Sequence, residues 1–399
     1  MRIGINGRFL IAKQTGVQRV AFNLIKTLIQ LDSDNEYFLF TGPGEVNKKE
    51  WQHKNCHVIA SNIYPGRTLR NLLWEQSTLP SLAKKYKVDL LHSPANMAPL
   101  FYRGKSIITI YDVCFVVNPQ WYSFLFRTWY TFIIPKLAHK ATKVITDSNN
   151  SRNDILKFCK IEINKINLVY WAVDEAFIES YKRRKTQPNR PKEDYILFVG
   201  SVEPRKNINT LLQAYERMRL SHPSIKTKLM IIGGENPIFA NQTLAIDKYK
   251  SDIIIKGFVE EDQLREYYLS ALLVAYPSLY EGFGLPPLEA MASGTPVITS
   301  NTSSLPEVVA DAAITIHPYD VTSLADALYR LITNESLRDE LIAKGLEQVG
   351  RFSWYRVARG VLSAYYQAHP GESLESESQK SYIPFDKWQR ILALEQAAR

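Results

Sequence analysis

Cysteine is scarce in this chain: three residues among 399, at positions 56, 114 and 159, with no C-x-x-C pair and no cysteine–histidine cluster. This scarcity argues against a disulfide framework and a zinc site, and it fits a reducing compartment. Apolar runs are also short, and none reaches the roughly 18 residues of a membrane-spanning helix. The N-terminal MRIGIN lacks the long apolar core of a signal peptide. We therefore expect no transmembrane helix and a cytoplasmic location.

Two familiar ligand motifs are missing or weak. The first loop, residues 7–16, lacks the G-x-G-x-x-G fingerprint, which argues against a dinucleotide-dependent dehydrogenase. The D-S-D string at 32–34 follows a helical pattern and precedes a strand, so we interpret it as a solvated turn. There is no recognisable base-reading module. The net charge of +9 favours anionic partners, such as nucleotide phosphates, a lipid surface or nucleic acid, without choosing among them.

Short apolar runs alternate with helical patterns along the whole chain, which predicts an α/β protein with mostly parallel sheets covered by helices on both faces. We expect domains at 1–180 and 195–365, a polar linker at 181–194, and a flexible spacer with a terminal helix at 371–399. The expected strands are residues 2–6, 37–41, 57–60, 88–91, 106–110, 143–147, 166–169, 195–199, 228–232, 253–256, 272–276, 296–299 and 314–316.

The most informative stretch is residues 281–289, EGFGLPPLE. Gly282 and Gly284 permit backbone angles closed to other residues and a close approach to a ligand. The two prolines that follow fit the first turn of a helix, and we expect Glu289 in that turn, beside exposed N–H groups. A helix N-terminus behind a glycine loop suits a phosphate, and ionised carboxylates accept hydrogen bonds from hydroxyls. The stretch therefore predicts a site for a nucleotide or a sugar nucleotide.

Residues 281–300, EGFGLPPLEAMASGTPVITS, with SSLPEVV at 303–309, resemble the signature of retaining nucleotide-sugar glycosyltransferases of the GT-B fold, glycosyltransferase family 4, mannosyltransferases among them. The resemblance implies two Rossmann-like, doubly wound domains that face each other across a cleft. The first would bind the acceptor and the second the nucleotide sugar, with the last helix packing back on the first domain. Glu281 would hold the transferred sugar and Glu289 the ribose. The loop Gly282, Phe283, Gly284 and Leu285 would meet the donor.

Further donor-binding positions come from the same resemblance. Arg205 and Lys206 lie in the loop after strand 195–199, where a strand gives way to a helix, and two cations there suit a diphosphate on chemical grounds as well. Many family members carry the arginine directly after the glycine, where this chain has Ser201. The backbone of KGFV, 256–259, would meet the nucleobase. The remaining expected donor contacts are Gly16, Val17, Gly200, Phe258 and Val259.

The strand at 106–110 ends in Tyr111-Asp112, where the family usually has His-Asp. Asp112 matches, and it would orient the acceptor hydroxyl or act as a weak base; a turn-starting aspartate is the alternative. Tyr111 replaces the histidine and would offer the donor sugar a hydroxyl or a carbonyl. His92, at the end of another strand, is interpreted as a hydrogen-bonded structural histidine rather than a catalyst.

Residues 114–136, CFVVNPQWYSFLFRTWYTFIIPK, are unusually rich in aromatic side chains. One interpretation is a buried helix pair that lines the cleft. The other is a surface that meets a lipid-linked acceptor or a membrane face, because aromatic and basic groups suit the lipid interface.

Together these features predict a retaining glycosyltransferase that moves a hexose of mannose or glucose type from a GDP- or UDP-linked donor to a saccharide or lipid-linked saccharide. Its setting would be bacterial polysaccharide or glycolipid synthesis, in the cytoplasm or at the inner face of the membrane. The resemblance implies no cofactor and no metal, and in that case lysine and arginine would have to offset the diphosphate charge. Two alternatives stay open: a sugar-nucleotide epimerase of the same architecture, and a non-catalytic scaffold. Nucleic acid is not an expected partner.

Overall fold

The computed structural model describes residues 1–12, 15–186, 193–234, 239, 244 and 249–369. The expected spacer and terminal helix at 371–399 lie outside these residues. The described chain divides into two compact units. Unit 1 contains Met1–Val113, Trp129–Trp171 and the described residues from Ser353 onward, and unit 2 contains Cys114–Thr128 and Ala172–Phe352. Each unit therefore combines segments that are far apart in the sequence.

Unit 1 is built on a seven-stranded sheet in the order β3-β2-β1-β4-β5-β6-β7. Every pairing in it is parallel, so the carboxyl ends of all its strands lie at one edge. All seven strands expected in this half are confirmed, with boundaries that differ by up to two residues. Their bounds are β1 (Arg2–Asn6), β2 (Glu36–Thr41), β3 (Cys56–Ala60), β4 (Leu90–Ser93), β5 (Lys105–Thr109), β6 (Lys143–Thr146) and β7 (Ile166–Leu168).

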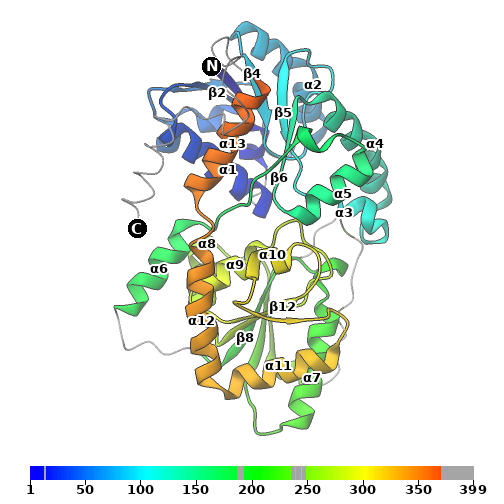
Figure 1. The fold of residues 1–399 in the computed structure, drawn as a ribbon, viewed down its shortest axis with the longest axis vertical. Coiled ribbons are helices and arrows are strands. Elements are labelled where there is room, and N and C mark those ends of the chain that lie inside the picture. Colours follow the sequence, from blue (N-terminus) through cyan, green and yellow to red (C-terminus); the bar gives the residue numbers. More distant parts are fainter. Residues whose placement is uncertain (13–14, 187–192, 235–238, 240–243, 245–248, 370–399) are drawn as a thin grey trace. The chain divides into compact units, whose positions relative to one another are not determined.

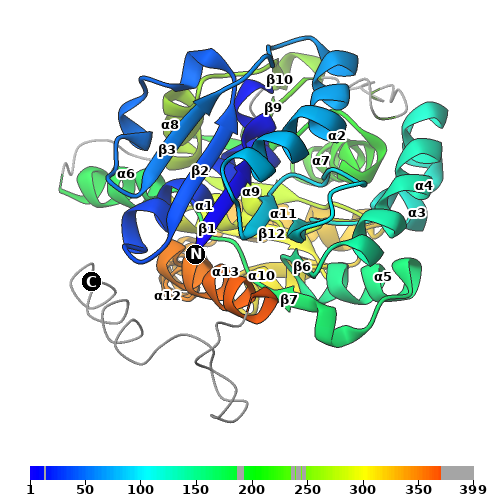
Figure 2. The same ribbon diagram turned by 90° about the horizontal axis from the view of Figure 1, so that it is seen from above.

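Helices cover this sheet, and Figures 1 and 2 show α13, close to the end of the described chain, beside α1, close to its start. The α-helices that contribute to unit 1 are α1 (Gly16–Leu31), α2 (Thr68–Lys85), α4 (Phe124–Lys140), α5 (Asn149–Cys159) and α13 (Trp354–Ala368); α4 starts within the share of unit 2. Short 3-10 helices are η1 (Gly7–Ile11), η2 (Pro43–Glu45), η3 (Lys49–Trp51) and η5 (Ile163–Lys165).

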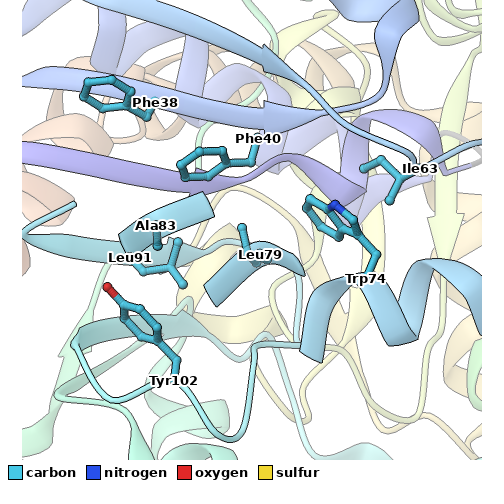
Figure 3. Close-up of a cluster of buried hydrophobic side chains, with 8 residues drawn as sticks. All are labelled: Phe38, Phe40, Ile63, Trp74, Leu79, Ala83, Leu91 and Tyr102. Atoms are coloured by element: carbon cyan, nitrogen blue, oxygen red, sulfur yellow. The ribbon is translucent and has the colours of Figure 1, made fainter. Parts of the chain in front are cut away.

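One part of the unit 1 core lies between the sheet and α2 (Figure 3). Strand residues Phe38, Phe40 and Leu91 alternate with residues of the opposite face, as the two-residue period of a strand requires. Helix residues Trp74, Leu79 and Ala83, together with Ile63 and Tyr102 from loops, complete the cluster. These apolar contacts fix α2 against the sheet.

Unit 2 contains a six-stranded sheet in the order β10-β9-β8-β11-β12-β13, again parallel throughout. Its strands are β8 (Tyr195–Val199), β9 (Lys228–Ile232), β10 (Ile253–Lys256), β11 (Leu273–Tyr276), β12 (Val297–Ser300) and β13 (Ile314–Ile316), all at expected positions. The other elements of unit 2 are α3 (Cys114–Val117), η4 (Pro119–Trp121), α6 (Glu175–Lys185), η6 (Pro204–Lys206), α7 (Ile208–Ser221), η7 (Lys250–Asp252), α8 (Glu261–Ser270), α9 (Leu285–Ala292), α10 (Leu305–Val309), α11 (Val321–Thr333) and α12 (Glu335–Val349).

The segment expected to be a linker begins with regular structure, because α6 runs through Lys185. Asp174 caps this helix, its side chain accepting a hydrogen bond from the backbone N–H of Ala176, and four cationic residues in the last turn favour the negative end of the helix dipole. Residues 187–192 lie outside the described part. Among the helices that the structure describes, none has the length and hydropathy to cross a membrane.

Candidate functional site

The candidate site forms at the carboxyl edge of the unit 2 sheet, where loops of neighbouring strands meet. Strand β8 leads through Gly200 into η6, which carries Arg205 and Lys206, and its neighbour β11 leads into the loop that starts at Glu281. Parallel α/β sheets bind ligands at this edge. The strand order therefore explains why residues some 75 positions apart come together.

Glu281 is buried and both of its carboxylate oxygens are occupied. Arg205 Nη1 donates to Oε2 at 2.7 Å, and Lys206 Nζ donates to Oε1 at 2.7 Å. Tyr276, the last residue of β11, also donates its hydroxyl to Oε1 at 2.8 Å, and Lys206 Nζ contacts that same hydroxyl. Three groups thus converge on one carboxylate.

A second carboxylate, Glu203, balances the charge of the cluster. Its Oε1 forms an ion pair with Arg205 Nε at 2.5 Å, and the residue is completely buried. The ring of Phe239 lies against the guanidinium of Arg205, 5.5 Å from ring centroid to Cζ, and Tyr122 packs on Phe239 with ring centroids 4.9 Å apart. Two carboxylates and Lys206 are therefore buried beside aromatic rings, together with the partly exposed Arg205.

Electrostatics fix the charge of Glu281. Burial alone would raise its pKa, but Arg205 and Lys206 outweigh that effect and lower the pKa to about 2. Burial, with the charge of Arg205, lowers the pKa of Lys206, against the opposing pull of Glu281 and Glu203. Burial raises the pKa of Glu203 despite Arg205. Glu281 is thus an anion at neutral pH, and a pure hydrogen-bond acceptor.

The glycine loop after Glu281 is held through its main chain. Gly284 has a φ of 117°, in the region that favours glycine, and a Cβ there would come 3.0 Å from Leu305 Cδ2. Ser303 exchanges two hydrogen bonds with Glu281: its hydroxyl donates to the carbonyl at 2.7 Å and accepts from the N–H at 3.0 Å. Ser304 donates to the carbonyl of Phe283 at 2.6 Å. Gly282 and Phe283 are buried in this loop, and partly buried Leu285 starts α9.

The expected position of Glu289 is wrong. Helix α9 begins at Leu285, so Glu289 lies in its second turn and not among the exposed N–H groups of the first. The helix starts one residue before the proline pair, so residues 285–288 form its first turn and Glu289 is the first residue after it. Glu289 is buried and accepts a hydrogen bond from the hydroxyl of Tyr268 at 3.0 Å.

Gly200 and Gly233 meet at the ends of β8 and β9. A Cβ on Gly233 would come 2.0 Å from the carbonyl oxygen of Gly200, and Gly233 has a φ of 144°. A Cβ on Gly200 would in turn meet the side chain of Lys206 at 3.5 Å. After β10, Phe258 is exposed and Val259 is half-buried. The loops of three adjacent strands therefore lie at the same edge.

In unit 1, the expected residues also lie at the carboxyl edge of the sheet. Gly16 is the first residue of α1, so its N–H and that of Val17 lack partners within the helix. Tyr111 is buried, and its hydroxyl donates to the carbonyl of Pro94 at 2.9 Å, with the Val17 carbonyl at 3.4 Å. The Tyr111 hydroxyl, which we expected to contact the donor sugar, therefore bonds the main chain.

Asp112 is half-buried and lies near a second carboxyl group, Asp147, at the end of β6. Burial and the charge of Asp112 raise the pKa of Asp147 well above its usual range, while the indole of Trp171 donates to Asp147 Oδ2 at 2.9 Å. Two carboxyl groups with different environments thus follow adjacent strands. His92 is fully buried between Tyr365 and Thr109, at 2.7 and 3.0 Å, which supports its structural interpretation.

The aromatic stretch 114–136 is divided between burial and exposure. Cys114, Phe115, Ile133 and Ile134 are buried. Along α4, the exposed large side chains are Phe124, Leu125, Trp129 and Phe132. The stretch therefore has a buried side and an exposed side, and both interpretations of it stay predictions.

Sequence reasoning missed Tyr276, Glu203, the serine pair 303–304, and Glu75 in unit 1. Glu75 accepts from Asn6 Nδ2 at 2.6 Å and pairs with Arg8 Nη1 at 2.5 Å, beside the end of β1. The sequence did contain a signal for the Glu203–Arg205 ion pair, because an acidic residue two positions before Arg205 can pair with it. Tyr276 reads only as the last residue of an apolar strand. Within the described residues, no three His, Cys, Asp or Glu side chains gather as a metal site requires.

Comparison with known proteins matches both halves of the chain. Residues 14–177 match the family described as Glycosyltransferase Family 4, and residues 180–348 match Glycosyl transferases group 1. O-antigen chain mannosyltransferase B of Escherichia coli is 27% identical over 379 residues, covering 88% of this chain and 96% of that protein.

Solved structures show the same fold at lower identity. A sucrose-phosphate synthase from Thermosynechococcus elongatus is 20% identical, covers 92% of this chain and 98% of its own, and has a TM-score of 0.68. Anabaena HepE in complex with UDP-glucose is 16% identical, covers 92% and 99%, and has a TM-score of 0.62. The two parallel sheets, the two matched families and the mannosyltransferase relative together show that this chain is a glycosyltransferase of the GT-B fold and belongs to glycosyltransferase family 4.

Proposed function

We propose that this glycosyltransferase moves a hexose, mannose in the first instance, from a nucleoside diphosphate sugar to a saccharide hydroxyl with retention at the anomeric carbon. The observation that carries the proposal is the buried cluster of Glu281, Arg205 and Lys206 at the carboxyl edge of the unit 2 sheet. A diphosphate needs cations, and a sugar needs an acceptor for its hydroxyls. The cluster offers both within a few ångströms.

The cations would act on the leaving group. As the bond between sugar and diphosphate breaks, negative charge grows on the phosphate oxygens, and Arg205 and Lys206 would stabilise it in a low-dielectric site. Glu281 keeps both cations charged and oriented before the donor arrives, and its oxygens would then accept hydroxyls of the transferred sugar. The departing phosphate oxygen would take the acceptor proton, so no separate nucleophile is required. We propose that these cations take the place of a metal.

Unit 1 would supply the acceptor side. Gly16 and Val17 would offer helix N-terminal N–H groups to the donor phosphates. Asp112 would orient the acceptor hydroxyl, while Tyr111 would contribute shape rather than its engaged hydroxyl. Glu289 would hold the ribose of the nucleoside, and the backbone of Phe258 and Val259 would meet the edge of the base.

The choice of mannose rests on the relatives, since the Escherichia coli protein is an O-antigen chain mannosyltransferase. The Anabaena structure holds UDP-glucose, so GDP and UDP both stay candidates for the nucleotide. Bacterial polysaccharide assembly on a lipid-linked acceptor fits the activity in the name of the Escherichia coli relative. Three free cysteines fit a cytoplasmic location, and the exposed aromatic side chains of α4 fit contact with the inner face of a membrane.

The test is product analysis with purified protein. GDP-mannose, UDP-mannose and UDP-glucose would each be incubated with mannose oligosaccharides, with and without EDTA, and the products analysed by NMR. An α-linked mannoside formed from an α-linked donor, insensitive to EDTA, is the expected result. A changed sugar nucleotide without acceptor would favour the epimerase alternative, and no reaction with any donor would favour the scaffold.

A further inference from the structure

A cavity of about 530 Å³ opens in unit 1 away from the catalytic edge. It is lined by the end of α4, the start of β6 and the segment that joins α5 to β7. Strand β6 carries Lys143 at its first residue and leads to Asp147 immediately after its last. Four strand residues span roughly 13 Å. The cavity therefore lies at the amino edge of the sheet, opposite the edge that holds Asp112 and Asp147.

The lining is basic. Three lysines, Lys143, Lys160 and Lys165, line it with one carboxylate residue, Glu162. The remaining lining residues are His139, Thr142, Ile161 and Asn164. Lys143 Nζ donates to the carbonyl of Asn164, and Lys165 Nζ to the carbonyl of His139, each at 2.6 Å. Each ammonium has three donors, so both retain donors for another acceptor. These backbone bonds hold two cations in place for a multiply charged anion.

Lys160 occupies its position at a conformational cost. It ends α5 with a φ of 52°, in the left-handed region, and its N–H bonds the carbonyl of Leu156. A residue with a side chain costs about 1 kcal/mol more than glycine in this conformation. The charge around it is also concentrated, because residues 136–165 contain seven Lys or Arg and three Asp or Glu.

Apolar side chains stand exposed beside this basic site. Ile163, which lies in the sequence between the lining residues Glu162 and Asn164, is 64% exposed. On α4, Trp129 and Phe132 are 43% and 56% exposed, and the exposed stripe continues at helical spacing into Lys136 and Lys140. From Trp129 to Lys140 the stripe measures roughly 16 Å along the helix. Helix α4 leads directly to β6, next to α5, as Figures 1 and 2 show.

We propose that this cavity binds the phosphate headgroup of an anionic phospholipid and that α4 lies against the same membrane surface. A soluble phosphate ligand needs no exposed isoleucine or tryptophan, whereas a lipid surface suits aromatic and aliphatic side chains next to lysines. Each lysine near an anionic membrane contributes a favourable interaction, and here several lie together. The proposal deepens the membrane contact proposed above, but it is independent of the sugar-transfer reaction.

The test uses flotation of the full chain with vesicles of phosphatidylcholine alone or mixed equally with phosphatidylglycerol. We expect binding to the mixed vesicles and little to the neutral ones. Lys160→Gly removes one cation while relieving the left-handed backbone, so it should fold normally and bind about fivefold more weakly. Lys87→Gly is the matched control: that exposed lysine also has a left-handed φ, 50°, at the end of a helix.

Phe132→Ser tests the apolar part, with Leu220→Ser as control, since Leu220 is similarly exposed on α7. Only the first substitution should reduce vesicle binding. Equal losses for Lys160→Gly and Lys87→Gly, or no preference for anionic vesicles, would overturn the proposal. A melting temperature raised by inorganic phosphate through Lys160, without vesicle binding, would also overturn it in favour of a free phosphate. Transfer to a soluble saccharide should be unchanged in Lys160→Gly, which separates this site from the catalytic one.

Discussion

Arg205 and Glu281 form a direct ion pair, 2.7 Å from Nη1 to Oε2, although they lie on loops that follow different strands. The pair exists because β8 and β11 are neighbours in the sheet. Glu281 therefore has two roles. It orients the two cations, and in the proposed function it accepts hydroxyls of the sugar.

Glu281→Gln should abolish transfer while changing the site in a measurable way. The substitution leaves Lys206 and part of Arg205 buried without their anion, so the free energy of unfolding should fall by about 3 kcal/mol. Pyrophosphate should then stabilise the variant more than the wild type, because it replaces the missing charge. Thermal melts with and without pyrophosphate test this. The exposed Glu347→Gln serves as control, and equal stabilisation of all three proteins would contradict the prediction.

Lys206→Met should weaken the binding of a nucleoside diphosphate and spare that of the nucleoside. A hydrogen bond to a charged group contributes about 1.5–3 kcal/mol, which corresponds to roughly 10- to 150-fold in affinity. Isothermal titration with guanosine, GDP, uridine and UDP distinguishes the two effects. Lys226→Met, an exposed lysine of the same unit, controls for net charge. An unchanged diphosphate affinity in Lys206→Met would remove this residue from the proposed mechanism.

Acid should destabilise the protein in two pH windows that overlap between about pH 4.5 and 3. Burial lowers the pKa of His92 from 6.5 to about 3, so the folded state keeps the ring neutral while the unfolded chain binds a proton below pH 6.5. Stability in unit 1 should therefore fall as the pH drops from 6.5 towards 3. The pKa of Glu281 is about 2 instead of 4.5, so its contribution, of the order of 3 kcal/mol, is complete above pH 4.5 and is lost towards pH 2.

Urea unfolding at a series of pH values measures both windows. His92→Gln should weaken the pH dependence of the free energy of unfolding in the upper window, and Glu281→Gln should weaken it in the lower one. If His92→Gln leaves the slope between pH 6.5 and 4.5 unchanged, burial of a neutral histidine is not its cause.

Gly233→Ala should damage the donor site through the backbone alone. Its Cβ would come 2.0 Å from the carbonyl oxygen of Gly200, so the ends of β8 and β9 must separate. We expect a loss of several kcal/mol in stability and of nucleotide binding. Gly234→Ala is a matched control, since a Cβ there meets nothing within 4 Å. Similar melting temperatures for the two variants would contradict the clash.

The sequence was most informative where a pattern is local. Apolar runs bounded by polar loops identified the thirteen strands that the structure describes. Of the two glycines after Glu281, Gly284 adopts the positive φ that the sequence allowed, whereas Gly282 does not. The first error concerns the residue at which a helix begins. Glu289 lies just past the first turn of its helix and not within it, because the sequence does not say at which residue a helix starts before two prolines.

Contacts across the sheet were out of reach. The pairing of Glu281 with Arg205, Lys206 and Tyr276 depends on strand order, which no single loop encodes. Tyr111 shows the same limit. The sequence suggests that its hydroxyl is available to a ligand, but in the fold this hydroxyl donates to the carbonyl of Pro94. The resemblance to the family predicted which residues belong to the candidate site, whereas the structure shows the neighbours that shift their pKa values.

The contact between His92 and Tyr365 also has a consequence for how the protein is made. These residues are 273 positions apart, yet both are buried in unit 1, which closes its core with α13. A ribosome releases the first sheet early and α13 late, after the whole of unit 2. Unit 2 can therefore complete its fold first, while the apolar surface of unit 1 that α13 covers stays exposed until α13 has been synthesised. A chain terminated before Ser353 would keep its donor-site residues and still fail to finish its first half.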